Sequence, residues 1–221
     1  MRLVARDWAQ LYQLQDWALA RTRSVEHGFY LSGGTALARG YCQHRYSEDL
    51  DFFTNDAPEF GLWRDRCLEA LRREAEPSGL RLEIILREER FGRAVLHGEV
   101  PLKLEFLNDV PSRVGTPWQH PTLGMLDTKE NIFANKISAL LDREEPKDVA
   151  DIYWLCCREG LNVTEAIEHA GGKAAGVFPP LVAERLAGAS RAGVPRVFWI
   201  QEPESGRFAS ELQQVIQRIL E

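Results

Sequence analysis

The chain has 221 residues, of which 44% are hydrophobic and 27% charged, as expected for a globular protein with one large or two small domains. Its formal net charge of −6 disfavours broad, nonspecific binding of nucleic acid, although a local basic patch is compatible with it. No apolar run reaches the roughly 20 residues that span a bilayer, and residues 1–16 lack the apolar segment of a signal peptide. We therefore expect a cytoplasmic protein with no membrane partner.

The first half of the chain alternates helices with strands. Apolar residues at helical spacing predict helices over 7–24, 35–41 and 59–76. Short or alternating apolar runs predict strands over 29–31, 50–54, 81–88, 93–97 and 101–107. After Asn108 the alternation ends, and four turn-forming residues indicate an irregular connection: Pro111, Gly115, Pro117 and Pro121.

The second half is predicted to be mostly helical, with helices over 128–142, 146–158, 164–169, 180–189 and 209–220. The apolar residues 197–200 are expected to form a buried strand of the core, with an interface patch as the alternative. We place a boundary near residue 115, so that residues 1–115 form an α/β core and residues 116–221 form a helical region that completes the site. These elements predict an α+β fold with a mixed sheet flanked by helices.

The cysteines show no sign of a metal site or a redox motif. Neither a C-x-x-C pair nor the paired spacing of a zinc site is present among Cys42, Cys67, Cys156 and Cys157. We therefore expect structural thiols buried in the core.

A double glycine lies where a predicted strand meets a predicted helix, in the segment Tyr30-Leu31-Ser32-Gly33-Gly34-Thr35-Ala36-Leu37. Glycines at such a turn let backbone N–H groups approach a phosphate. The turn is therefore a candidate triphosphate site, with Gly33 and Gly34 supplying the backbone and Thr35 a hydroxyl. The alternative is a plain tight turn in which Thr35 caps the helix.

The next strand carries two carboxylates, Asp49 and Asp51, on the face opposite Leu50 and Phe52. Paired acids beside a phosphate cradle can hold Mg²⁺ against a nucleoside triphosphate, and such sites often hold two metal ions about 3.5–4 Å apart. We expect both aspartates to bridge the metals. The alternative is that they are solvent-facing strand residues.

A third acid is expected from a neighbouring strand. Glu105 is the best candidate because Leu102, Leu104 and Phe106 occupy the other face of its strand. It would complete one metal site and help deprotonate the attacking hydroxyl. Glu83, on an earlier strand, is its rival.

Basic residues complete the predicted site. Arg45 is placed to contact a phosphate or to hold a carboxylate, whereas we expect His44 to lie on the surface or to support the site rather than to act as a base. Lys136, at the margin of an apolar helix face, is the candidate for neutralising triphosphate charge. Asp148 and Asp151 could orient Lys136, Arg45 or Arg143, or could be ordinary acids at a helix N-terminus, and both interpretations stay open.

The glycine segment, followed by His44-Arg45-x-Ser47-x-Asp49-Leu50-Asp51-Phe52-Phe53, resembles the AbiEii/AbiGii toxin-type nucleotidyltransferases of the DNA-polymerase-β-like superfamily. Two later segments resemble that family's third and fourth motifs: Lys136-Ile137-Ser138-Ala139-Leu140 and Lys147-Asp148-x-x-Asp151-Ile152-Tyr153. The match spans about residues 28–155.

The resemblance implies a minimal nucleotidyltransferase fold with a helical companion region. It implies Mg²⁺-dependent transfer of a nucleotide from an NTP, with Mn²⁺ as a possible substitute. The acceptor in such toxins can be the 3′ end of tRNA, a protein acceptor is the alternative, and a cognate antitoxin is often present. The resemblance also marks Lys136 and Asp148 as functional. Where the superfamily usually has Gly-Ser, this chain has Gly33-Gly34, so the hydroxyl contact would come from Thr35 or Ser32.

Two other functions compete with nucleotide transfer. A family member that has lost catalysis could bind a nucleotide or a partner without turnover. A metal-dependent phosphohydrolase could use the same acids, but the chain has no histidine-rich metal cluster in its sequence, which disfavours it.

Overall fold

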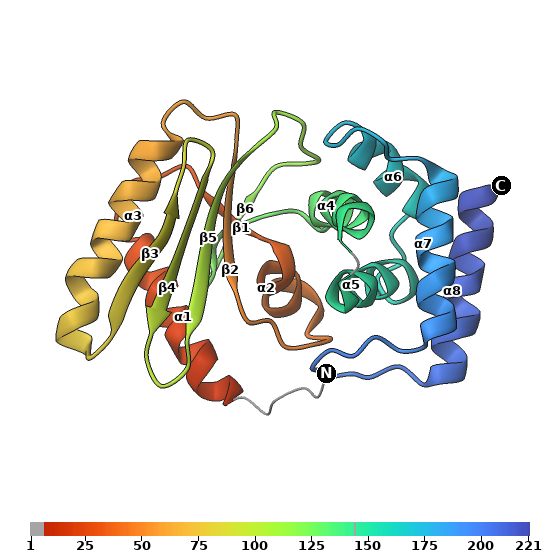
Figure 1. Ribbon diagram of the computed structural model, residues 1–221, viewed down its shortest axis with the longest axis horizontal. Helices are drawn as coiled ribbons and strands as arrows, with labels where there is room; N and C mark the ends of the chain where they lie inside the picture. The colour runs from red at the N-terminus through yellow and green to blue at the C-terminus, as the bar shows by residue number, and fades with distance from the viewer. Residues whose placement is uncertain (1–6, 144) are drawn as a thin grey trace.

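The computed structural model describes residues 7–143 and 145–221 (Figure 1). Residues 1–6, which belong to the segment 1–16 expected to lack a signal peptide, lie outside the described residues. A seven-stranded mixed sheet has the order β3-β4-β5-β2-β1-β7-β6. Its strands are β1 (Tyr30–Ser32), β2 (Leu50–Asn55), β3 (Arg81–Arg87), β4 (Phe91–His97), β5 (Leu102–Asp109), β6 (Trp118–His120) and β7 (Gly124–Leu126). The β2–β5 and β1–β7 pairs are parallel and the other pairs are antiparallel.

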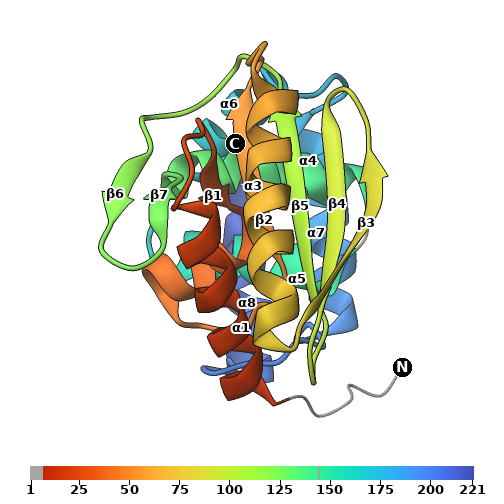
Figure 2. The same cartoon turned by 90° about the vertical axis from the view of Figure 1, so that its left-hand side faces the viewer.

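Helices cover both faces of this sheet. One face carries α1 (Trp8–Thr22) and α3 (Phe60–Ala75), which lie in front of the strands in Figure 2. The other face carries α2 (Gly33–Leu37), which continues into a π-helical turn, Ala38–Cys42. Beyond α2 lie the C-terminal helices α4 (Lys129–Asp142), α5 (Pro146–Cys157), α6 (Val163–Gly171), α7 (Pro179–Ala192) and α8 (Ser205–Leu220) (Figure 1).

Alternation along the central strands separates the core from the site. In β2 and β5 every second residue is buried, and the buried side chains face α1 and α3. Phe52 and Phe106 stack there with ring centroids 5.1 Å apart, and Phe29 links Phe106 to Phe60 of α3 through edge contacts. Because successive side chains of a strand point to opposite faces, the remaining side chains of β2 and β5 point toward α2 and α4.

The predicted mixed sheet with flanking helices is confirmed, but two strands were missed. Strands β6 and β7 lie in the segment predicted as an irregular connection, and each has only three residues, which is too short to show alternation. Strand β7 pairs in parallel with β1 through Leu31 and Leu126. The sheet therefore extends beyond residue 115.

The segment predicted as a buried strand over 197–200 differs in the structure. It belongs to the connection between α7 and α8, where Trp199 forms a single antiparallel bridge with Arg45. Trp199 is partly buried against the core, whereas Ile200 is 47% exposed. The expectation of a core strand was therefore wrong for Ile200, because only one side of the segment is covered.

The cysteines are free thiols, as expected: Cys42, Cys67 and Cys156 are buried and Cys157 is partly buried. None of the described helices combines the length and the apolar character that crossing a membrane requires.

Candidate active site

A cleft of about 210 Å³ lies between the sheet and α4 and collects most of the predicted site residues. Those that line it are Ser32, Gly33, Gly34, Arg45, Asp49, Asp51, Glu105 and Lys136. Thr35 and Asp148 do not line the cleft, because both are fully buried behind it. The rival acid Glu83 lies outside the cleft on the edge strand β3, paired with His97 and Arg81.

The acids form a row across the sheet. Asp51 and Glu105 are register partners on the parallel strands β2 and β5, and Ser32 is the partner of Asp51 on β1. Asp49 precedes Asp51 by two residues and therefore shares its face. Burial, together with the charges of Asp49 and Glu105, raises the pKa of Asp51 to about 7. Such crowding of carboxylates is the electrostatic setting that attracts a cation.

Two cations on the sheet already contact this acid row. The Lys103 ammonium lies 3.1 Å from Asp49 Oδ2 and 3.3 Å from Glu105 Oε1. The Arg93 guanidinium places Nε and Nη2 at 2.7 Å and 2.6 Å from the same Glu105 oxygen. Although burial opposes its charge, Asp49 and Glu105 raise the pKa of Lys103. Sequence reasoning missed both residues, because a basic residue on a polar strand face looks like ordinary surface.

The three acids Asp49, Asp51 and Glu105 are the residues expected to bind metal ions. Among residues 7–143 and 145–221, no three His, Cys, Asp or Glu side chains form a group that could hold a metal ion. Asp49, Asp51 and Glu105 therefore do not stand as a common set of ligands. Asp49 and Asp51 on their own still fit Mg²⁺, which is commonly held by one or two carboxylates together with phosphate oxygens and water.

Glycine is required at both positions of the turn. Gly33 has φ +68°, and a Cβ atom there would collide with the Asp51 carboxylate. At Gly34 a Cβ atom would lie 2.7 Å from Arg45 Nη2 and 2.8 Å from Ser47 Oγ. Arg45 and Ser47 therefore occupy the space that a side chain at residue 34 would need.

The two hydroxyls predicted to reach the substrate bind inside the protein. The Thr35 hydroxyl donates to the backbone oxygen of Asp49, and the Ser32 hydroxyl donates to Asp127 Oδ2 at 2.6 Å. Ser47, which sequence reasoning gave no role, lines the cleft beside Gly34. Its backbone is held by α1, whose Tyr12 and Gln15 bind the Ser47 N–H and carbonyl. The sequence signal that could have identified Ser47 is its position two residues before Asp49.

Behind the cleft, Lys136 is held in a buried ion network. Its ammonium lies 2.7 Å from Asp148 Oδ1 and 2.7 Å from Asp151 Oδ2. Arg143 Nε lies 3.0 Å from the other oxygen of Asp148. Burial opposes the charge of Lys136, but Asp151 and Asp148 outweigh it and raise the pKa of Lys136. Of the two interpretations of these aspartates, the structure supports the network.

Arg45 forms the second arm of this network. Its Nε and Nη2 each lie 2.7 Å from one oxygen of Asp151, and His44 Nε2 lies 2.8 Å from Oδ1. Despite burial, Arg45 and Lys136 hold the pKa of Asp151 well below its usual range. Burial lowers the pKa of His44, which favours the neutral ring. Arg45 thus holds a carboxylate, one of its two predicted roles, while its side chain also lines the cleft.

The C-terminal region fixes the backbone beside Arg45. The N–H groups of Ile200 and Gln201 donate to the His44 carbonyl, and the Tyr46 N–H donates to the Phe198 carbonyl. His44 also packs 5.3 Å from the Trp154 ring of α5. The connection between α7 and α8 therefore positions a loop that contributes to the cleft.

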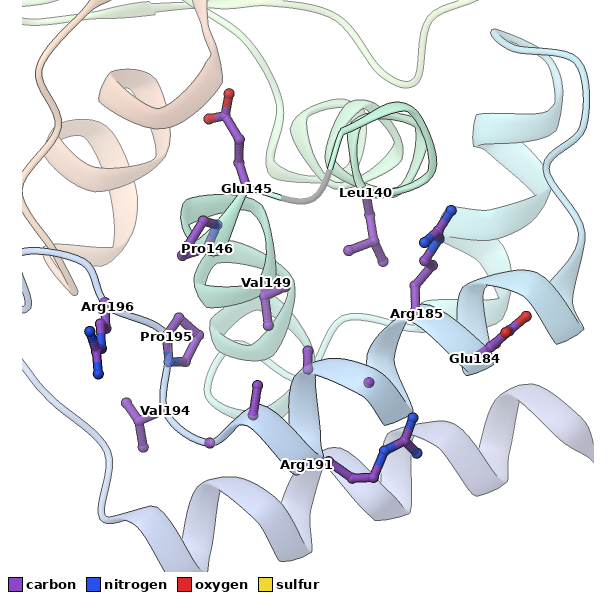
Figure 3. A pocket seen from close by; sticks show the side chains of 14 residues that line it. Leu140, Glu145, Pro146, Val149, Glu184, Arg185, Arg191, Val194, Pro195 and Arg196 are labelled. Carbon is purple, nitrogen blue, oxygen red and sulfur yellow. The ribbon is translucent and has the colours of Figure 1, made fainter. Parts of the chain in front are cut away.

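A larger cavity of about 600 Å³ lies between α4, the start of α5 and the second half of α7 (Figure 3). Its floor is apolar, with Leu140, Val149 and Pro195, and arginines such as Arg191 and Arg196 stand at its edge. None of the predicted site residues lines it. The convergence of acids, glycines and cations therefore favours the smaller cleft as the site of chemistry.

A family model and several solved structures are similar to this chain. A family model described as nucleotidyl transferase AbiEii toxin, Type IV TA system, matches residues 17–214. The fold is similar to that of an H. pylori protein described as a nucleotidyltransferase, with 21% identity, 97% of this chain and 96% of that chain covered, and a TM-score of 0.63. It is also similar to JHP933 from Helicobacter pylori, with 21% identity, coverage of 98% and 93%, and a TM-score of 0.61.

A third similar structure is MenT4, a nucleotidyltransferase toxin from Mycobacterium tuberculosis H37Rv, with 16% identity, coverage of 97% and 84%, and a TM-score of 0.54. No curated protein matches the chain. At these identities the structural likeness shows the fold alone. Because the family model covers most of its length, the chain belongs to the AbiEii nucleotidyltransferase toxin family.

Proposed function

We propose that this protein transfers a nucleotide from an NTP to an acceptor hydroxyl in a Mg²⁺-dependent reaction, with Mn²⁺ as a substitute cation. The observation that carries the proposal is the meeting of three features in one cleft. The acids Asp49 and Asp51, the glycine turn and Lys136 all line it. Membership of a nucleotidyltransferase family supports the reaction class.

The triphosphate is assigned to the side of the cleft formed by the glycine turn and α4. Gly33 and Gly34 offer backbone close to the ligand, and Ser47 offers a hydroxyl. Lys136, Arg143 and Lys147 also line the cleft and supply positive charge. Because Arg143 and Lys147 are only partly covered, at 47% and 37% exposure of their side chains, they are accessible to an incoming anion.

The acid row performs the transfer. Asp49 and Asp51 would hold Mg²⁺, which neutralises charge on the phosphates as the acceptor oxygen bonds to the α-phosphorus and pyrophosphate leaves. We assign to Glu105 the role of receiving the proton of the acceptor hydroxyl. Within the described part of the chain, Lys103 and Arg93 both contact Oε1 of Glu105, and no residue hydrogen bonds or ion pairs with Oε2. Oε2 is therefore the oxygen placed to receive the proton.

The acceptor is proposed to be the 3′ end of tRNA, with a hydroxyl on a protein as the alternative. Membership of a Type IV toxin–antitoxin family suggests that the protein acts in the cytoplasm together with a cognate antitoxin. A toxin of this kind would act by modifying an acceptor that the cell needs.

The proposal is tested by incubating the protein with each α-³²P-labelled NTP, Mg²⁺ and total tRNA. Label on tRNA, lost in Asp51→Ala and in Glu105→Ala, is the expected result. Glu83→Ala is the matched control, because Glu83 lies on β3 away from the cleft, and it should retain transfer. Nucleotide binding without transfer to tRNA or protein would instead favour the non-catalytic binding function.

A further inference from the structure

We infer that the Lys103 ammonium takes the place of a second metal ion, so that the site binds one divalent cation rather than two. This inference rests on the proposed function, because it concerns how the same acid row is neutralised. It replaces the two-metal arrangement expected from the acids alone.

The position of Lys103 is the first argument. Lys103 lies two residues before Glu105 on β5, so both side chains leave the same face of the sheet. Its ammonium lies 3.1 Å from Asp49 Oδ2 and 3.3 Å from Glu105 Oε1. A metal ion held by the bridging aspartates and completed by Glu105, as the acids alone predict, would have to contact both Asp49 and Glu105, where this ammonium lies.

The balance of charge is the second argument. Asp49 and Glu105 bring two negative charges, and Lys103 and Arg93 bring two positive charges within ion-pair distance of them. Asp51 forms no ion pair with either cation and is the acid left for a metal ion to pair with. A second divalent cation would lie within a few ångströms of an ammonium that is charged at neutral pH, and like charges at that distance repel strongly in a partly buried site.

The donor geometry is the third argument. Three carboxylates of the described chain do not form a common ligand group, whereas Asp49 and Asp51 lie on one face of one strand. The Lys103 side chain is 35% exposed, so it contacts the acids from outside the core. It can therefore contact the acids while the other wall of the cleft stays open to the triphosphate.

The test counts the Mn²⁺ ions bound per protein by electron paramagnetic resonance, in the presence of a saturating α,β-methylene NTP analogue. We expect one Mn²⁺ for the unmodified protein and two for Lys103→Met, in which the bridging position is free. Lys103→Arg keeps the charge and should bind one. Lys129→Met is the matched control, because Lys129 pairs with Glu159 and does not line the cleft, and it should also bind one.

Each other outcome has a definite meaning. Two Mn²⁺ ions in the unmodified protein would overturn the inference, as would one Mn²⁺ in both the unmodified protein and Lys103→Met, and both results leave the proposed nucleotide transfer standing. No bound Mn²⁺ in any variant would overturn the inference together with the metal dependence of the proposed function. Thermal melting verifies that each variant is folded, and Lys103→Gln serves the same test if Lys103→Met does not fold.

Discussion

Asp51 on β2 and Glu105 on β5 lie directly opposite one another in a parallel pair of strands, and Gly33 packs against the Asp51 carboxylate. The acid row and the glycine turn are therefore one structural unit. A side chain added at Gly33 should therefore displace the Asp51 carboxylate and disturb the acid row.

Gly33→Ala should destabilise the protein. The left-handed backbone at Gly33 disfavours any side chain by about 1–3 kcal/mol, and the new methyl group would also displace the Asp51 carboxylate. For a chain of this length each kcal/mol lowers the melting temperature by about 2–4 °C. Gly206→Ala in α8 is the control, because nothing lies within 4 Å of a Cβ atom there. Equal melting temperatures for the two variants would contradict this account of the turn.

Ser47 should contribute to NTP binding in place of a side chain at residue 34. We predict that Ser47→Ala weakens NTP affinity by about 10–150-fold, as expected for the loss of a hydrogen bond to a charged group. Ser210→Ala is the control, because Ser210 lies on α8 outside the cleft, and it should keep the affinity. Calorimetry with a non-reactive NTP analogue measures both. A Ser47→Ala variant of unchanged affinity would remove Ser47 from the site.

The pH dependence of stability should report Asp51. Burial and its acidic neighbours raise the pKa of Asp51 from 3.8 to about 7, so between those values the folded protein keeps a proton that the unfolded chain has released. The Asp51 contribution to stability is therefore lost as pH rises through this range. In the presence of a chelator, Asp51→Asn should be more stable than the unmodified protein at pH 8 and gain little at pH 4.

Asp65→Asn supplies the opposite control for this experiment. Although burial acts against them, hydrogen bonds from Arg87 and Arg64 lower the pKa of Asp65, so its carboxylate stabilises the fold at neutral pH. Melting curves from pH 4 to pH 8 should show a gain for Asp51→Asn that grows with pH and a nearly constant loss for Asp65→Asn, whose carboxylate contribution is lost only below about pH 4. Parallel trends would contradict the electrostatic description of the acid row.

Lys136 should prove both structural and functional, and a second substitution can separate the two roles. Lys136→Met leaves Asp148 and Asp151 buried with fewer counter-charges, and breaking a buried ion pair costs about 3–5 kcal/mol. Adding Asp148→Asn should restore part of the stability without restoring NTP affinity. Denaturant unfolding and calorimetry give the two quantities. Recovery of affinity in the double variant would mean that Lys136 acts only through the fold.

The sequence predicts those parts of the site that depend on local pattern. Alternation along β2 and β5 was enough to place Asp51 and Glu105 on the face away from the core. The pairing of Arg45 with Asp151 was one of several alternatives left open by the sequence, and only the packing of α5 behind the cleft selects it. Strands β6 and β7 were too short to carry a pattern. Lys103 followed the same alternation as Glu105, but nothing in its residue type distinguished it from surface.

The central claim is that this cleft transfers a nucleotide, and a comparison of two labels tests it most directly. The protein is incubated with Mg²⁺, total tRNA and the active NTP, labelled with ³²P at either the α- or the γ-phosphate. The account predicts that α-label moves to the acceptor and γ-label appears in pyrophosphate, and that both are lost in Asp51→Ala. Release of γ-label as inorganic phosphate, with no α-label on any acceptor, would contradict it and identify a phosphohydrolase.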